Sequence, residues 1–515
     1  MNKFSKLLGF DPEAKQTTVK TELVAGVVTF LAMAYILTVN PNQILYAGTS
    51  DARWSSLFLA TAFGAIIGTL LMAFFAKMPL AQASGMGLNS LIGSIIGGGI
   101  GYYAYGFEFT IGQAFMMVLI SGIIFLIVSL LKIKGKSLRE WIFDGMPVAV
   151  RGAISVGIGL FIAYIGFQNA GVIITNNFTQ VGFVDFTNWG QQIINNGSVV
   201  EGMIVAPVAF AAAKTAAVAL IGLFIITILD KFNVKGSIIL GILGATIVGI
   251  PFGVTDLSIL KGEGGISWKF WENYGNFFSV GENSVFGSFT GVFKDGFPSG
   301  AVFTVIMLII TMCMIDMFDT MGTIVGCCGG NRLLSDENNK PHNYDKIMIS
   351  DAVATCAGAM LGTSTVTTFV ESGAGVSAGG RTGLTAFTVA CLFFVATFML
   401  PVFAAIPSAA TASALIYVGV LMMKNNIKSI DFSTAINATS AFLTIVVMVL
   451  SYSITKGIGV GLLTHTILSL ITYVVEVIVR VVKKDVEKPK FEVSVVSLVV
   501  SVLFIVYFFV PVTLF

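Results

Sequence analysis

The stretch Ala81-Gln-Ala-Ser-Gly-Met-Gly-Leu-Asn-Ser-Leu-Ile-Gly-Ser-Ile-Ile-Gly-Gly-Gly-Ile-Gly101 is apolar enough to enter a membrane, yet seven glycines interrupt it. A second stretch of the same character is Thr363-Ser-Thr-Val-Thr-Thr-Phe-Val-Glu-Ser-Gly-Ala-Gly-Val-Ser-Ala-Gly-Gly-Arg381. Short, Gly-interrupted segments at matching positions in the two halves of a chain indicate broken transmembrane helices around a transport site. Close helix packing through small residues is the alternative interpretation of the same glycines.

The composition around these two stretches is that of a polytopic membrane protein. Only 11% of the 515 residues are charged, whereas a soluble domain carries roughly 25%. Hydrophobic residues make up 56% of the chain, and the mean hydropathy is +0.90. These values exclude a disordered, collagen-like or nucleic-acid-binding chain. The five cysteines are odd in number and lie in or beside apolar runs, so they do not form a disulfide framework.

Hydropathy predicts fourteen transmembrane spans, seven on each side of a polar stretch at 255–298. They are 21–40, 57–76, 82–99, 112–131, 148–167, 206–229 and 236–254, then 299–325, 347–363, 367–381, 383–404, 409–423, 434–453 and 457–479. The first run reaches spanning length, which favours an uncleaved helix over a signal peptide. A further apolar run at 492–514 is either a fifteenth span or a membrane-edge helix.

Positive charge tests this span count. With the N-terminus inside, 23 of the 29 Lys and Arg residues fall in inside segments, as the positive-inside rule requires. Seven spans per half is an odd number, so the second half enters from the opposite side, as in inverted-repeat transporters. The predicted organisation is an N-terminal segment 1–20, a first repeat 21–254, an extracellular linker 255–298, a second repeat 299–482, and a C-terminal segment 483–515 with basic residues and the extra hydrophobic run.

Three carboxylates lie deep inside the predicted spans. Asp316 and Asp319 project from nearly the same face of the eighth span, and Glu371 lies in the tenth. With no intramembrane Arg or Lys clearly available, the three cannot all be ionised cheaply, so at least one should carry a proton. They are therefore candidates for proton coupling. A carboxylate can also hold the N–H donors of a nucleobase edge. The alternative is a carboxyl satisfied by backbone N–H groups at a broken helix.

Few other polar side chains stand out. Asn89 is the polar residue of the third span, and its amide suits either a ring edge or nearby backbone. Thr323 and Ser372 neighbour the carboxylates and are further candidates for substrate binding. His342 and His465 have no ligand-type neighbours at metal spacing, so we expect no metal site and no other cofactor. The chain lacks a Walker A motif, which argues against ATP-driven transport.

Four motifs of this sequence resemble those of the adenine/guanine/hypoxanthine permeases. These form the AzgA-like branch of the nucleobase–cation symporters and are related to the uracil and xanthine permeases. The resemblance runs from about residue 4 to residue 482. The motifs are Phe30-Leu-Ala-Met-Ala-Tyr-Ile-Leu-Thr-Val-Asn-Pro41, Ser84-Gly-Met-Gly-Leu-Asn89, Phe318-Asp-Thr-Met-Gly-Thr323 and Glu371-Ser-Gly-Ala-Gly-Val-Ser-Ala-Gly-Gly-Arg-Thr-Gly-Leu-Thr385.

The resemblance implies an all-α polytopic fold of two inverted seven-span repeats. A core domain would contain spans 1–4 and 8–11, and a gate domain spans 5–7 and 12–14. The third and tenth spans would each pair a short strand with a half-helix. Relatives also suggest a homodimer through gate surfaces.

The resemblance further implies a purine pocket in the core domain. By motif position, Asp319 and Glu371 hold the base, and Asn89 matches a polar position used by the purine branch. Thr323 stands where the uracil-type branch has a His, so a proton relay through that His is absent. The other implied pocket positions are Ser84, Gly85, Phe369, Val370 and Ser372, and the Phe369 ring could stack on the base.

The sequence therefore predicts a multi-pass importer of hypoxanthine, guanine and adenine in the plasma (inner) membrane, with a cytoplasmic N-terminus and proton symport. Sodium coupling is left open, and no nucleic acid partner is expected. One alternative is a sulfate- or dicarboxylate-type anion permease, which the acidic pair disfavours because an anion needs helix N-termini or Arg. Another is a prenyltransferase-like enzyme that holds magnesium through Asp316 and Asp319, but such a site needs a second acidic cluster.

Overall fold

The structure is a computed structural model of the chain. It describes residues 7–45, 51–96, 107–133, 136–137, 145–176, 180–187, 189, 192–193, 199–200, 203–204, 209–210, 212–234, 236–261, 267–279, 284–328, 332–335, 341–451, 453–483 and 493–509.

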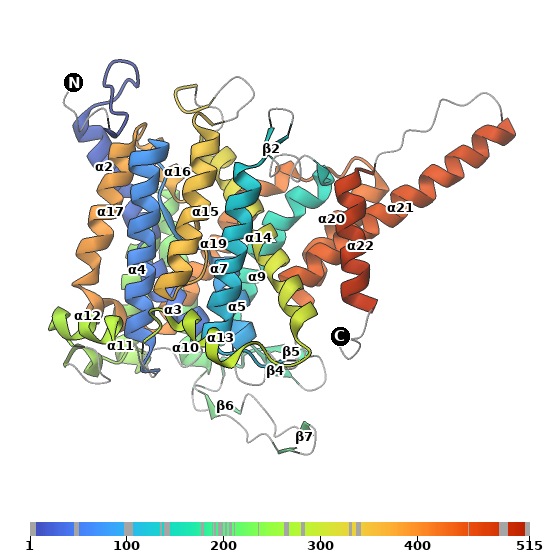
Figure 1. Ribbon diagram of the computed structural model, residues 1–515. Coiled ribbons are helices and arrows are strands. Elements are labelled where there is room, and N and C mark those ends of the chain that lie inside the picture. Colours follow the sequence, from blue (N-terminus) through green and yellow to red (C-terminus); the bar gives the residue numbers. More distant parts are fainter. Residues whose placement is uncertain are drawn as a thin grey trace.

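Long helices stand side by side and form most of the molecule (Figure 1). The first half of the chain contributes α2 (Val19–Met33), α3 (Ile36–Ile44), α4 (Trp54–Leu71), α5 (Met86–Ile96), α7 (Ile111–Leu130), α9 (Val148–Asn169), α10 (Ala212–Lys231) and α11 (Ser237–Phe252). The second half contributes α12 (Phe270–Phe278), α13 (Val292–Asp295), α14 (Val302–Cys328), α15 (Tyr344–Leu361), α16 (Ser372–Ser377), α17 (Gly383–Thr397), α18 (Leu400–Ala404), α19 (Ser408–Asn426), α20 (Ala435–Leu450), α21 (Ile454–Lys483) and α22 (Val495–Phe509).

The helices have the length and apolar surface of an integral membrane protein. Among the described residues, seven are long and apolar enough to cross a bilayer, and several shorter apolar helices accompany them. On α21, which projects from the bundle in Figure 1, the side chains of Ile471, Val474 and Ile478 are each more than half exposed. An apolar surface of this kind is stable in contact with lipid tails. The exact number of spans stays a prediction.

Two short strands from opposite halves of the chain pair at the centre. β1 (Gln82–Ser84) and β10 (Val366–Thr368) run antiparallel. A backbone hydrogen bond from the Gly85 N–H to the Thr365 carbonyl (2.9 Å) extends the pairing. β1 leads into α5 and β10 leads into α16, so each half supplies a strand followed by a helix. The Gly-interrupted stretches therefore meet at one place, in opposite orientations.

The remaining strands are short hairpin pairs outside the helices. They are β2 (Lys132–Ile133) with β3 (Lys136–Ser137), β4 (Ile173–Asn176) with β5 (Gln180–Phe183), β6 (Gln192–Ile193) with β9 (Ala209–Phe210), and β7 (Val199–Val200) with β8 (Met203–Ile204).

A buried carboxylate ties the strand pair to α14. Asp351 of α15 accepts hydrogen bonds from Gln82 Nε2 (3.0 Å) and from Thr320 Oγ1 (2.7 Å). A weaker contact comes from Thr368 Oγ1 (3.4 Å). These contacts fix α14 against both strands, and so they position the neighbouring residue Asp319. The sequence singled out three carboxylates inside the spans, and Asp351 is a further buried one, because its oxygens accept from donors on three other segments.

Helix packing separates two groups. In the first, α15 packs on α4 and α7, and α17 packs on α2 and α4. In the second, α9 packs on α19 and α20, and α10 packs on α11 and α19. The strand pair and α16 belong to the first group, since β1 contacts α4 and α16 contacts α2.

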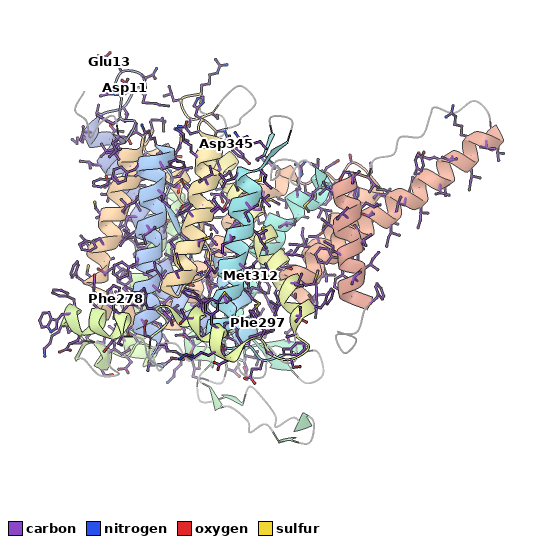
Figure 2. All side chains as sticks on the ribbon, viewed as in Figure 1. Asp11, Glu13, Phe278, Phe297, Met312 and Asp345 are labelled. Atoms are coloured by element: carbon purple, nitrogen blue, oxygen red, sulfur yellow. The ribbon has the colours of Figure 1, made fainter. Side chains whose placement is uncertain are left out.

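Labelled residues identify the two ends of the bundle. Figure 2 shows Asp11 and Asp345 at one end and Phe278 and Phe297 at the opposite end. An ion pair between Lys132 and Asp345 connects the region after α7 to the start of α15 at the first end. The N-terminal segment and these charged residues thus share one end of the molecule.

We expect Gly93→Ala to destabilise the protein because α5 lies directly against α3 at this residue. A Cβ on Gly93 would lie 2.2 Å from the Gln43 carbonyl oxygen, a backbone atom that cannot rotate away. Overpacking of this kind costs about 1–3 kcal/mol. The midpoint of thermal unfolding in detergent should therefore fall. Gly275→Ala is the control, since its Cβ would meet no atom within 4 Å, and equal midpoints for the two variants would contradict the packing.

Candidate substrate-binding site

A cavity of about 930 Å³ lies between the two helix groups. The first group contributes Asp319, Thr323, Phe369, Val370 and Glu371 to its lining. The second group contributes Ile158 of α9, Asp230 of α10 and Tyr417 of α19. Ligand sites of small molecules commonly have volumes of roughly 300–1,000 Å³ and lie between domains. The cavity is therefore the place in the described structure where a small ligand would meet both groups.

Glu371 reaches the cavity because the chain turns sharply after β10. The residue is the N-cap of α16, and its side chain is buried. Tyr35 Oη donates a hydrogen bond to Glu371 Oε1 at 2.6 Å. Glu371 Oε2 is also buried, and within the described residues it has no hydrogen-bond partner. One carboxyl oxygen is thus hydrogen-bonded to the protein, whereas the other has no hydrogen-bond partner in the described part of the chain.

Asp319 lines the same cavity from α14, whereas Asp316 does not. Asp316 is fully buried and accepts a hydrogen bond from Thr355 Oγ1 (3.1 Å) on α15. Three residues along a helix correspond to a rotation of about 300°, so the two side chains point about 60° apart. That angle is enough to direct one carboxylate to the cavity and the other to α15. The predicted role of Asp316 in proton coupling stays a prediction.

Three predicted pocket residues lie at the strand pair and not on the cavity lining. Ser84 Oγ pairs with Thr363 Oγ1 (2.7 Å), and Ser372 Oγ accepts a hydrogen bond from the Ala81 N–H (3.0 Å). Gly85 continues the backbone pairing, and a Cβ there would lie 3.2 Å from the Thr367 side chain. These residues fix the two broken spans to each other. Their direct contact with a substrate stays a prediction.

Asn89 is buried behind the cavity on α5. Its Oδ1 accepts a hydrogen bond from Ser364 Oγ, which joins α5 to the segment before β10. Its Nδ2 is buried and has no hydrogen-bond partner in the part of the chain that the structure describes. Asn89 therefore lies in a polar layer shared by the two halves. Whether it contacts a ligand is likewise left as a prediction.

Arg381, the last residue of the predicted tenth span, lines the cavity, although sequence analysis assigned it no role there. Its guanidinium donates from Nη1 to the carbonyl oxygens of Val376 (2.5 Å) and Gly380 (2.7 Å). These carbonyls lie at and beyond the C-terminal end of α16, where a cation is favourable. A cation is thus present at the cavity, contrary to the expectation. The signal that could have found it is a lone Arg directly after a Gly-rich half-helix.

Tyr35 was also missed. It was part of a quoted motif, but nothing in the sequence links it to Glu371, which lies 336 residues away. Cys327 is another cavity residue without a predicted role, and its Sγ contacts the Val370 carbonyl at 3.4 Å. Among the described residues, no three His, Cys, Asp or Glu side chains gather in a way that could hold a metal ion.

Comparisons with known proteins agree on one family. A model described as "Permease family" (Xan_ur_permease) matches residues 20–194 and 191–460. Adenine permease AdeQ of Escherichia coli is 33% identical over 457 residues, covering 88% of each chain. Guanine/hypoxanthine permease PbuO of Bacillus subtilis is 32% identical over 471 residues, covering 89% of this chain and 93% of the relative.

The fold also matches solved transporters. The transmembrane domain of the cyanobacterial bicarbonate transporter BicA aligns with a TM-score of 0.54, covering 85% of this chain and 97% of that domain. The identity is only 16%, so this likeness concerns the fold alone. It supports the inverted-repeat fold.

Proposed function

We propose that this chain, which belongs to the Permease family (Xan_ur_permease), imports purine nucleobases by proton symport. Membership of that family makes it a transporter and not an enzyme. The proposed substrates are guanine, hypoxanthine and adenine, because relatives over most of the chain are adenine and guanine/hypoxanthine permeases. The proposed location is the plasma membrane, with the N-terminus in the cytoplasm. The bias of Lys and Arg toward the predicted inside segments supports this orientation.

The observation that carries the proposal is the pair of carboxylates on one cavity. Asp319 lies on α14 and Glu371 at the start of α16, yet both line the same space. Purine edges present N–H donors, which a carboxylate oxygen accepts. Phe369 adds an aromatic ring to the lining, which suits a planar bicyclic base.

The same carboxylates support proton coupling. A carboxylate inside a membrane protein is costly when it is ionised and unpaired, so it gains from binding a proton or a donor. In this proposal the two carboxylates take up a proton together with the base on the outside and lose both on the inside. Sodium is the competing coupling ion.

We also propose that the two helix groups are the core and gate of an alternating-access transporter. Spans 1–4 and 8–11 would form the core, and spans 5–7 and 12–14 the gate. The packing of α9, α10, α11, α19 and α20 with one another supports this division. The cavity lies between the groups, so a movement of one against the other would open it to either side.

Uptake by proteoliposomes tests the proposal. Radiolabelled guanine, hypoxanthine, adenine, xanthine, uracil and bicarbonate would each be offered with and without an inward proton gradient, and with sodium replaced by potassium. We expect accumulation of one or more of the three proposed purines that depends on the proton gradient and not on sodium. Uptake that ignores the proton gradient would reject the coupling but keep the substrate class. Uptake of bicarbonate alone would reject the substrate class.

A further inference from the structure

Tyr35 lies at a break in the first span. α2 ends at Met33 and α3 begins at Ile36, so the Tyr35 backbone sits between two helical segments. The side chain is 1% exposed, and its hydroxyl lies 2.6 Å from Glu371 Oε1 and 3.5 Å from Met86 Sδ. The hydroxyl has a single hydrogen and thioether sulfur is a weak acceptor, so the carboxyl oxygen receives the bond.

The backbone on both sides of Glu371 is fixed by other contacts. Before it, β10 pairs with β1, and after it, Ser372 Oγ accepts the Ala81 N–H. The remaining freedom of Glu371 is the rotation of its own side chain. The Tyr35 hydroxyl removes that freedom, because it anchors Oε1 and leaves Oε2 as the unpartnered oxygen of a side chain that lines the cavity.

We propose that Tyr35 is a positioning residue that limits Glu371 to a one-oxygen contact with the purine. This inference rests on the proposed function. A free carboxylate can accept two parallel hydrogen bonds, one on each oxygen. Guanine offers such a pair on one edge, the N1–H and the 2-amino group, whereas hypoxanthine offers only the N1–H there. Tyr35 is buried and does not line the cavity, so its bond holds Oε1 away from the base and directs Oε2 toward it. Both purines then make the same single bond to Oε2, and guanine gains no advantage at Glu371.

Tyr35→Phe removes the anchor while it keeps the ring that fills the space. We expect the Kd for hypoxanthine to rise about 10-fold, since the carboxylate is no longer held toward the cavity. The Kd for guanine should rise less, because the released Oε1 can accept the 2-amino group. The preference for guanine over hypoxanthine should therefore increase about 5-fold, roughly the contribution of one hydrogen bond. Binding would be measured by calorimetry on the purified full-length protein.

A matched control and a double variant separate positioning from general damage. Tyr274→Phe also removes a tyrosine hydroxyl bonded at 2.6 Å, to Thr397 Oγ1, but this pair lies away from the cavity. We expect both purines to bind this variant as they bind the wild type. Tyr35→Phe combined with Glu371→Gln should bind no worse than Glu371→Gln alone, since the hydroxyl acts through the carboxylate. The proposal would be overturned if Tyr35→Phe weakened the binding of both purines equally, and if this loss of affinity added to that of Glu371→Gln in the double variant.

Infrared spectroscopy tests the anchor without any substrate. The infrared band of the Glu371 carboxyl group is identified as the band that disappears in Glu371→Gln. We expect this band to lie at a different frequency in ligand-free Tyr35→Phe than in the ligand-free wild type. An unshifted band would overturn the inference, whatever the transport results are. A shifted band in a protein that binds no purine would confirm the hydrogen bond between Tyr35 and Glu371. It would nevertheless reject both the proposed function and the one-oxygen contact of Glu371 with a purine.

Discussion

Glu371→Gln is expected to lower the initial rate of guanine and hypoxanthine uptake about 100-fold. The carboxyl group has one oxygen bonded to Tyr35 and one left for the ligand. A glutamine amide can donate to the Tyr35 oxygen and leave its carbonyl oxygen for the base, but that oxygen is uncharged, and the amide cannot bind a proton. A hydrogen bond to a charged group contributes about 1.5–3 kcal/mol, which corresponds to roughly a 10- to 150-fold loss.

The control for this prediction is a carboxylate elsewhere in the chain. Glu272 is exposed on α12 and pairs with Lys269 at 3.2 Å, so Glu272→Gln removes a charge without touching the cavity. Uptake by this variant should equal that of the wild type in the same vesicles. Both variants should show the same thermal unfolding midpoint as the wild type within about 1 °C. Wild-type uptake by Glu371→Gln would remove Glu371 from the proposed site.

The family and fold class could be predicted from sequence. The family resemblance is confirmed, and so is the all-α membrane fold with inverted repeats. The reason is that glycines at matching positions of the two halves leave a signature in a single sequence. The two stretches begin at residues 81 and 363, which are 282 residues apart, and their similar Gly-rich composition connected them. The structure pairs β1 with β10 inside these stretches.

The site could be predicted only in part. Asp319 and Glu371 were found because a carboxylate in an apolar run is conspicuous, and the structure brings both to one cavity. Asp316 was grouped with them because residue spacing along a helix does not tell which of two close directions faces the cavity. Asp351 was overlooked because it lies near the start of its predicted span, where a carboxylate usually faces water. Its donors, on β1 and α14, come from distant segments that sequence spacing cannot relate.

The N-terminus of α17 depends on one buried carboxylate from the first span. Glu22 of α2 is fully buried and accepts hydrogen bonds from the N–H groups of Arg381 (3.0 Å) and Thr382 (3.3 Å). It also accepts one from Thr385 Oγ1 (2.5 Å). These two N–H groups belong to the N-cap residue Thr382 and the residue before it, and an anion beside a helix N-terminus is favoured by the helix dipole. Glu22 supplies that anion from a helix 360 residues away along the chain.

Glu22→Ala should therefore be the most destabilising of these substitutions. Two backbone N–H groups and the Thr385 hydroxyl lose their bonds to the carboxylate at once, and the hydroxyl keeps only the Glu22 carbonyl at 3.3 Å. An unsatisfied buried group typically costs about 1–3 kcal/mol. We expect a fall of about 10 °C in the thermal unfolding midpoint and a smaller yield of folded protein from membranes. Glu22→Gln should fall about half as far, since its carbonyl oxygen still accepts while its amide opposes a donor.

Glu13→Ala is the control for charge alone, because Glu13 is exposed in the same N-terminal region. Its unfolding midpoint should match the wild type. If Glu22→Ala also unfolded at the wild-type temperature, the contact between α2 and α17 would not stabilise the core. If Glu22→Gln fell as far as Glu22→Ala, the negative charge itself would be the stabilising feature. The predicted order therefore tests whether hydrogen bonding or charge holds the two helices together.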